Sequence, residues 1–170
     1  TLIVTFDDGY ADNLLVATPI LQGLDLTAVV YISTDFVDQQ QLFWFDEIAY
    51  LIRHWSIGRL VLADGKFDMS ISQGNREAIR RALGLFLQTL SDPERMVVLE
   101  EIRTKANVSA NPEDYHYAAP LSWSQVKQLR QANIEIGSHT RSHGFLDAMT
   151  QSELEYQIVG SKKHIEQQIS

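Results

Sequence analysis

Hydrophobic and polar positions alternate in blocks along the first part of the chain. Residues 1–6 are rich in β-branched and aromatic side chains and precede Asp7-Asp8-Gly9, which predicts a buried strand ending in a turn. Apolar residues then recur with helical spacing over 14–21, and residues 26–32 form a second apolar run of strand length. This strand, helix, strand order predicts an α/β fold with a parallel sheet or barrel, in which the loops after the strands carry the functional site.

The middle of the chain interrupts this alternation. Polar and apolar residues alternate over 59–69 on both sides of Asp64-Gly65, a dipeptide typical of a two-residue β-hairpin turn. Because such a hairpin is antiparallel, it does not continue the pattern of parallel strands. We therefore predict a helical and β-hairpin insertion over about residues 38–119.

The rest of this insertion is predicted to be helical. Apolar residues have helical spacing over 44–55 and 76–90. Ser91 and Glu94 fit a capping box, which indicates the start of a further helix. The polar stretch 107–119 contains a proline and is predicted as a loop.

After the insertion the α/β pattern resumes. Ser122 and Gln125 fit a second capping box, and a short apolar strand follows over 134–137. Residues 138–143 come directly after this strand and include two histidines. A third capping box begins at Thr150 and indicates a final helix that runs to the end of the sequence.

Composition narrows the class of protein. The chain has 170 residues, of which 45% are hydrophobic and 21% charged, and it is treated as a single domain over 1–170. A net charge of −8 argues against a nucleic-acid partner. There are no cysteines, so a metal ion would be held by His, Asp, Glu or water. No apolar run approaches the roughly 20 residues of a transmembrane helix.

Asp7 and Asp8 are the first candidate functional residues. Two neighbouring carboxylates raise each other's proton affinity, and a bound cation relieves that repulsion. A turn at Gly9 would let both side chains reach one opening, although they start on opposite sides of a strand. Taken alone, the triplet also fits an ordinary polar turn.

His139 and His143 are the second candidates. They are four residues apart, so on a helical turn both imidazoles would share one face and could bind one ion. Taken alone, the pair also fits two capping or surface histidines. Both the acidic and the histidine pairs follow predicted strands, where an α/β fold gathers its functional loops. Two histidines and one carboxylate are a common ligand set for a catalytic divalent ion.

Two segments carry a family resemblance. Thr5-Phe6-Asp7-Asp8-Gly9 and His139-Thr140-Arg141-Ser142-His143 resemble the first two motifs of the polysaccharide deacetylase family, the NodB-homology group similar to carbohydrate esterase family 4. The resemblance implies a distorted (β/α) barrel. It also implies that Asp7 is the catalytic base and that Asp8, His139 and His143 bind a divalent metal, with zinc expected first and cobalt, nickel or iron as alternatives.

The resemblance also implies a reaction. The family hydrolyses N-acetyl groups, or sometimes O-acetyl groups, on sugars, so the expected partner is an acetylated polysaccharide or oligosaccharide such as an N-acetylglucosamine glycan. The alternative is a catalytically silent module that keeps the metal and glycan site. A phosphatase with an aspartate nucleophile is disfavoured, because that chemistry uses an Asp-x-Asp spacing and Asp7 and Asp8 are adjacent.

The later family motifs, including the one that supplies the catalytic acid, have no counterpart before Ser170. We therefore expect a partial domain with an incomplete barrel, whose open sheet edge favours homo-oligomers. The resemblance suggests the bacterial cell envelope or the extracellular space and leaves the cytoplasm open.

For several other side chains the sequence allows only less specific predictions. His164 does not match the missing acid motif, Trp123 is expected to be structural, and Arg141 is expected to be solvated. The aromatic run 43–45 fits either a sugar-stacking platform or helix packing.

Overall fold

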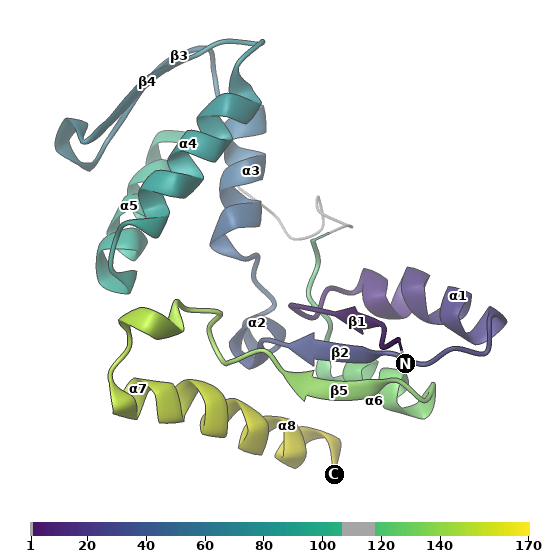
Figure 1. Cartoon of the computed structure of the whole chain (residues 1–170). Coiled ribbons are helices and arrows are strands. Elements are labelled where there is room, and N and C mark those ends of the chain that lie inside the picture. The colour runs from purple at the N-terminus through teal and green to yellow at the C-terminus, as the bar shows by residue number, and fades with distance from the viewer. Residues whose placement is uncertain (1, 107–117) are drawn as a thin grey trace. The chain divides into compact units, whose positions relative to one another are not determined.

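The computed structural model describes residues 2–106 and 118–170 and divides the chain into two compact units. Unit 1 combines Thr1–Leu42 with Pro112–Ser170, and unit 2 is Phe43–Asn111 (Figure 1). Unit 2 falls within the predicted span 38–119, although its origin as an insertion stays a prediction. Most of the loop predicted over 107–119 lies outside the described residues.

Unit 1 contains a parallel sheet of three strands, and the α/β prediction is confirmed. The strands are β1 (Thr5–Phe6), β2 (Val29–Ile32) and β5 (Glu135–Ser138), in the order β1-β2-β5. Thr5 pairs with Val29, and β2 pairs along its whole length with β5. All three strands therefore end at the same edge of the sheet. No closed barrel forms among the residues that the structure describes.

Strand β1 is much shorter than the predicted buried strand over 1–6. Only Thr5 and Phe6 pair with β2, and Leu2 and Ile3 are 90% and 70% exposed. The apolar pattern alone over-predicted this strand, because residues 2 and 3 lie beyond the register that β2 offers. What the pattern did locate is the carboxyl end of β1, where Asp7 and Asp8 follow.

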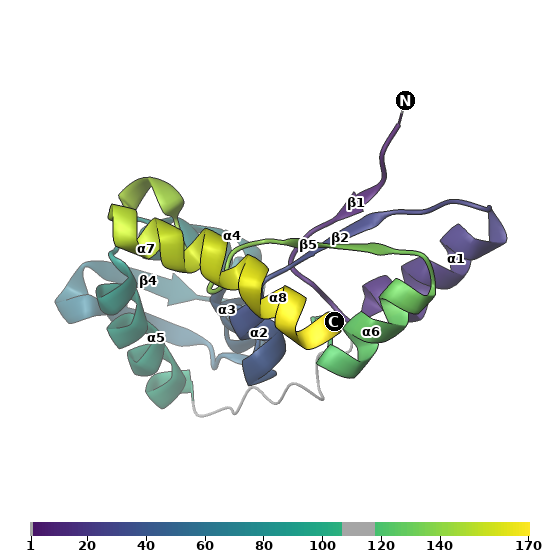
Figure 2. The ribbon, with the colours of Figure 1, turned by 90° about the horizontal axis from the view of Figure 1, so that it is seen from below.

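The helices of unit 1 bury one face of the sheet. They are a π-helical turn at Asn13–Ala17 continuing into α1 (Thr18–Gly23), then α2 (Thr34–Gln39) and α6 (Trp123–Gln131). The last helix runs through α7 (Gln151–Glu155), a π-helical turn at Tyr156–Gly160 and α8 (Ser161–Ile169). In the view of Figure 2, α1, α6 and α8 lie on one side of the strands. The core there includes Val30, Ile32, Val126, Leu129, Ile134 and Ile165.

Two predicted capping boxes of unit 1 are confirmed. The Ser122 hydroxyl accepts a hydrogen bond from the Gln125 N–H, and the Gln125 side chain accepts from the Ser122 N–H. Thr150 and Glu153 make the same reciprocal pair before α7. Each box satisfies two backbone donors that the first helical turn leaves without a partner.

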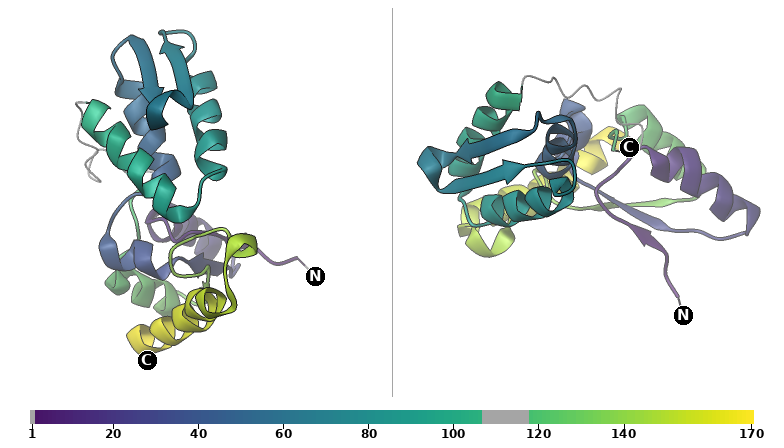
Figure 3. Two further views of the ribbon diagram at one scale, coloured as in Figure 1. Left: turned by 90° about the vertical axis from the view of Figure 1, so that its left-hand side faces the viewer. Right: turned by 90° about the horizontal axis from the view of Figure 1, so that it is seen from above.

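Unit 2 has a separate core between three helices and a hairpin. Helices α3 (Trp44–His54), α4 (Arg76–Gln88) and α5 (Asp92–Ala106) lie beside β3 (Gly58–Leu62) and β4 (Phe67–Ile71) (Figure 3). The core of this unit includes Ile48, Leu51, Ile52, Leu60, Leu62, Ile79, Leu83, Leu87 and Ile102.

The hairpin of unit 2 has a longer connection than the predicted two residues. Leu62 pairs with Phe67, so residues 63–66 join the strands. Ala63, Asp64 and Gly65 all have positive φ, and they form a short 3-10 turn. The predicted hairpin is confirmed, but its connection is longer than two residues because Ala63 also leaves the strand conformation.

No helix among the described residues is long and apolar enough to cross a membrane.

Gly137 in β5 provides a test of packing on this sheet. A Cβ atom there would lie 2.5 Å from Cε1 of Tyr31 and would also collide with Cδ1 of that ring. We expect Gly137→Ala to lower the free energy of unfolding by about 1–3 kcal/mol because the ring must move. Urea unfolding would measure the change.

Gly23→Ala is the matched control, because Gly23 ends α1 and a Cβ atom there meets nothing within 4 Å. This variant should be as stable as the wild type, or more stable by up to about 1 kcal/mol. Equal stability of both variants would contradict the packing of Tyr31 on Gly137.

Candidate metal centre

Asp8 lies in a tight turn directly after β1. Asp8 has φ of 75° and Gly9 has φ of 90°, and the Gly9 N–H donates to the Asp7 carbonyl at 2.9 Å. Gly9 cannot easily be replaced, because a Cβ atom there would lie 3.0 Å from Cγ2 of Ile32. The turn is joined to β2 by the Ser33 N–H, which donates to the Asp8 carbonyl at 3.2 Å.

The two histidines lie in the loop that follows β5. The His139 N–H donates to the Ile32 carbonyl at 2.9 Å, so this loop starts beside the end of β2. The loop is not a helical turn, because residues 139–143 form no helix and Thr140 and His143 have φ of 69° and 56°. The left-handed residues curl the loop, and this brings the imidazoles together without helical spacing.

Asp8, His139 and His143 converge at one point. Asp8 Oδ1 lies 3.2 Å from Nε2 of His143 and 3.4 Å from Nε2 of His139, and the imidazole centroids are 5.0 Å apart. One ligand atom from each residue falls within 4.8 Å of the others. The three side chains are partly buried, at 19% exposure for Asp8 and 35% and 33% for His139 and His143.

These donors fit a cation. Asp8 Oδ1 is buried and has no hydrogen-bond partner among the residues that the structure describes. Burying such an oxygen is costly unless a positive charge or a donor compensates it. Two imidazole nitrogens and one carboxylate oxygen around one point suit zinc and the neighbouring transition metals.

Asp7 differs from Asp8 in its environment. Asp7 is exposed, whereas the positive φ of Asp8 turns the second carboxylate toward the histidines. Asp7 still acts on the site electrostatically, since its charge helps to raise the pKa of His143. The adjacent carboxylates therefore have separate positions, one among the imidazoles and one at the solvent-facing side.

The contact with the Asp8 carboxylate raises the pKa of the His143 imidazole above its usual 6.5, although burial opposes that shift. His143 is therefore drawn toward its protonated form in the free protein, and a metal ion would have to displace that proton.

Further polar groups hold the histidine loop and were not predicted. The Thr34 and Asp35 N–H groups of α2 donate to the Thr140 and Arg141 carbonyls at 3.2 and 2.9 Å. Thr140 supports a histidine as well, since its hydroxyl accepts from the His143 N–H at 3.0 Å.

Arg141 was expected to be solvated, and this expectation is wrong. Its guanidinium pairs with Asp35 at 2.9 Å, and the side chain is 19% exposed. The sequence spacing could not reveal this pair, because Asp35 lies 106 residues away.

Trp123 and His164 meet at Asp38, outside the metal centre. Trp123 Nε1 donates to Asp38 Oδ1 at 2.7 Å, and His164 Nε2 lies 3.0 Å from Asp38 Oδ2. This contact joins α2, α6 and α8, so Trp123 is structural as expected. His164 takes part in the same packing.

The aromatic run of unit 2 is largely helix packing. Phe43 is buried and stacks on Phe45 with ring centroids 5.0 Å apart, and Trp44 packs against the core of that unit.

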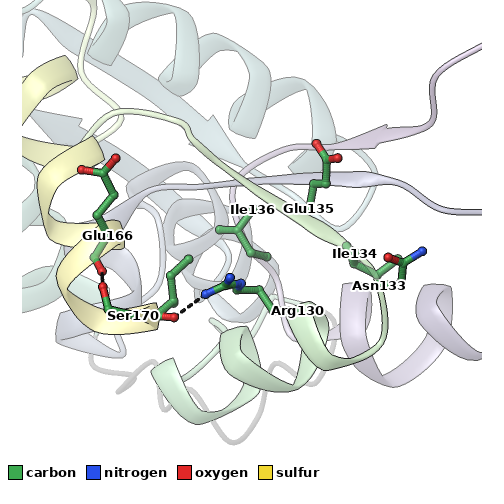
Figure 4. Close-up of a pocket in the computed structure, with 8 residues that line it drawn as sticks. Arg130, Asn133, Ile134, Glu135, Ile136, Glu166 and Ser170 are labelled. Carbon is green, nitrogen blue, oxygen red and sulfur yellow. Dashed lines mark hydrogen bonds between the residues drawn. The ribbon is translucent and has the colours of Figure 1, made fainter.

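A pocket of about 560 Å³ lies beside β5 (Figure 4). Its lining is Arg130, Asn133, Ile134, Glu135, Ile136, Glu166, Ile169 and Ser170, and it includes none of the predicted site residues. This pocket therefore does not coincide with the candidate metal centre.

Taken together, the fold and the site define an α/β protein with one aspartate and two histidines at the carboxyl ends of parallel strands. The family model for polysaccharide deacetylase matches residues 1–170, so the chain belongs to the polysaccharide deacetylase family. No match was found among curated proteins.

Two solved structures are similar to the chain. The deacetylase PplD of Streptococcus pyogenes, in complex with acetate, has 16% identity and a TM-score of 0.51, covering 98% of this chain and 40% of that one. The BpsB deacetylase domain of Bordetella bronchiseptica has 14% identity and a TM-score of 0.44, covering 98% and 50%. The chain thus spans half or less of these structures, and the likeness to PplD concerns the fold alone.

Asp38 gives a pH-dependent prediction for unit 1. Burial raises the pKa of Asp38, but the hydrogen bonds from Trp123 and His164 outweigh burial and lower it below 3.8. A carboxylate with a lowered pKa stabilises the fold above its unfolded pKa, and the effect is lost as pH falls through the folded value. We expect Asp38→Asn to lower the urea midpoint at pH 7, with a smaller difference near pH 3.

The control is Asp25→Asn, since Asp25 is exposed and asparagine tolerates its φ of 53°. Asp25→Asn should unfold like the wild type at both pH values. A deficit for Asp38→Asn that does not change with pH would contradict the role of its charge.

Proposed function

We propose that this chain carries the metal centre of a hydrolase that removes N-acetyl groups, or O-acetyl groups, from an acetylated polysaccharide. The buried Asp8 Oδ1, which faces the Nε2 atoms of His139 and His143, is the observation that supports it most. Membership of the polysaccharide deacetylase family supplies the substrate class. A glycan built on N-acetylglucosamine is the substrate that we propose to test first.

Zinc is the metal that we propose. Its usual catalytic sites have three protein ligands of the His and carboxylate type and an open position. Cobalt, nickel and iron accept the same donors. A divalent ion at this point would polarise the acetyl carbonyl and lower the pKa of water bound to it.

In this proposal Asp7 acts as the general base. Its carboxylate is exposed and adjacent to Asp8, so it can approach a water molecule near the three ligands without itself being among them. A base in that position accepts the proton of the attacking water. Asp8 instead holds the two imidazoles and the ion together. The alternative function is a module that binds metal and glycan without turnover.

Metal binding should stabilise the protein in a way that depends on the three ligands. At a free zinc concentration of 100 times the dissociation constant, we expect a gain of about 2.7 kcal/mol in the free energy of unfolding. His139→Ala and Asp8→Asn should lose most of this gain, because the first removes a ligand atom and the second removes the charge of the carboxylate ligand. Thermal unfolding with and without zinc would measure it.

His54→Ala is the matched control, because His54 is exposed and contacts Tyr50 in unit 2. That variant should keep the full zinc-dependent gain. The same gain in all variants would rule out Asp8 and His139 as ligands.

Hydrolysis is tested by acetate release from N-acetylglucosamine oligomers by the full-length protein with zinc or cobalt. Asp7→Asn should lower kcat by about 10²–10⁴-fold while zinc still binds, because a general base contributes that much. Asp25→Asn serves as the control of equal charge change. Zinc binding without acetate release in the wild type would favour the silent module, and full activity of Asp7→Asn would remove Asp7 from the mechanism.

A further inference from the structure

The histidine loop has a backbone that regular secondary structure does not support. Thr140 and His143 adopt left-handed conformations, which residues other than glycine rarely do without support from their surroundings. Because the loop lies outside any helix, the N–H groups of Arg141 and Ser142 have no helical partners. The position of both imidazoles therefore depends on what holds residues 140–142.

Gln157 holds the centre of this loop. Its Oε1 accepts from the Arg141 N–H at 2.9 Å and from the Ser142 N–H at 3.0 Å. Its Nε2 donates to the Ser142 hydroxyl at 2.8 Å, which fixes the orientation of the amide. Gln157 is only 7% exposed, so its amide is buried against the loop between the two histidines.

Ser161 adds a second support one helical turn further on. Its hydroxyl donates to the Thr140 carbonyl at 2.9 Å and accepts from the Ser138 hydroxyl at 2.8 Å. The side chain is fully buried. A buried polar group of this kind is tolerated because its hydrogen bonds are made.

Gln157 belongs to the π-helical turn at Tyr156–Gly160, and Ser161 is the residue that follows this turn. Tyr156, in the same turn, lies under the Arg141 guanidinium, 4.7 Å from the ring centroid. π-Helical turns inside helices often occur at functional sites. Here this π-helical turn, which is wider than an α-helical turn, and the Ser161 that follows it present three groups to the histidine loop: the ring of Tyr156, the amide of Gln157 and the hydroxyl of Ser161.

We propose that Gln157 is a positioning residue for the metal centre, which holds the 140–142 backbone so that His139 and His143 both reach Asp8. Ser161 assists from the next turn. Gln157 does not touch the ion in this proposal, and its effect passes through the Arg141 and Ser142 N–H groups. The inference rests on the proposed function, because it assumes that the three side chains bind metal.

Zinc affinity measured by competition with a chromogenic chelator tests this inference, and the visible spectrum of the cobalt-loaded protein reports the ligand geometry. Gln157→Met keeps the size of the side chain but removes the acceptor, and we expect it to weaken zinc binding by about 10–100-fold, as for other residues that orient ligands. We expect the cobalt spectrum to change as well. Gln157→Glu keeps an acceptor that the Ser142 hydroxyl can also meet, so it should restore affinity and spectrum.

Gln167→Met is the matched control, because Gln167 is exposed in the same helix. It should bind zinc like the wild type. A cooperatively folded Gln157→Met with wild-type affinity and spectrum would overturn the inference. Failure of the wild type itself to bind zinc would overturn the proposed function instead.

If Gln157→Met does not unfold cooperatively, the zinc affinity of Ser161→Ala tests the inference in its place. This variant removes one hydroxyl from a helical site that accepts alanine well. Weaker zinc binding by a folded Ser161→Ala would support the role of the widened turn. Unchanged affinity would overturn it.

Discussion

The candidate metal centre depends on backbone hydrogen bonds at the carboxyl end of β2. There the Ser33 N–H binds the carbonyl of Asp8, the Ile32 carbonyl binds the N–H of His139, and the Thr34 N–H binds the carbonyl of Thr140. These bonds attach the turn after β1 and the loop after β5 to one central strand. Because backbone groups at a strand end have few other partners, the same bonds that complete β2 also bring the ligands together.

The remaining order of the site comes from the last helix and from α2. The carbonyls of Thr140 and Arg141 meet the first turn of α2, and the N–H groups of Arg141 and Ser142 meet Gln157. The loop thus has partners for its N–H groups on the last helix and for its carbonyls on α2, and Ser161 of the last helix is a second donor to the Thr140 carbonyl. Every group in these contacts belongs to unit 1.

The parts of the structure that were predictable from sequence are those with local signals. The capping boxes at Ser122 and Thr150 and the strand ends just before Asp7 and His139 follow from short-range chemistry. Asp8, His139 and His143 could be grouped as candidate ligands because their motifs both follow strands. The length of β1 could not be predicted, because pairing with β2 limits it.

The supports of the site were not predictable either. In the sequence, Gln157 resembles an ordinary polar helix residue. In the structure it lies in the π-helical turn, and its side chain is buried. Arg141 looked solvated because its partner Asp35 is distant in sequence.

The positive φ angles of Asp8 and His143 restrict which residue types can stand as candidate ligands at these two positions. Aspartate and histidine are among the few residue types other than glycine that are enriched in left-handed conformations. A glutamate could supply the same carboxylate and a cysteine a thiolate, but neither belongs to that small group. At two of the three candidate ligands, therefore, the backbone conformation restricts which residue types fit before coordination chemistry does.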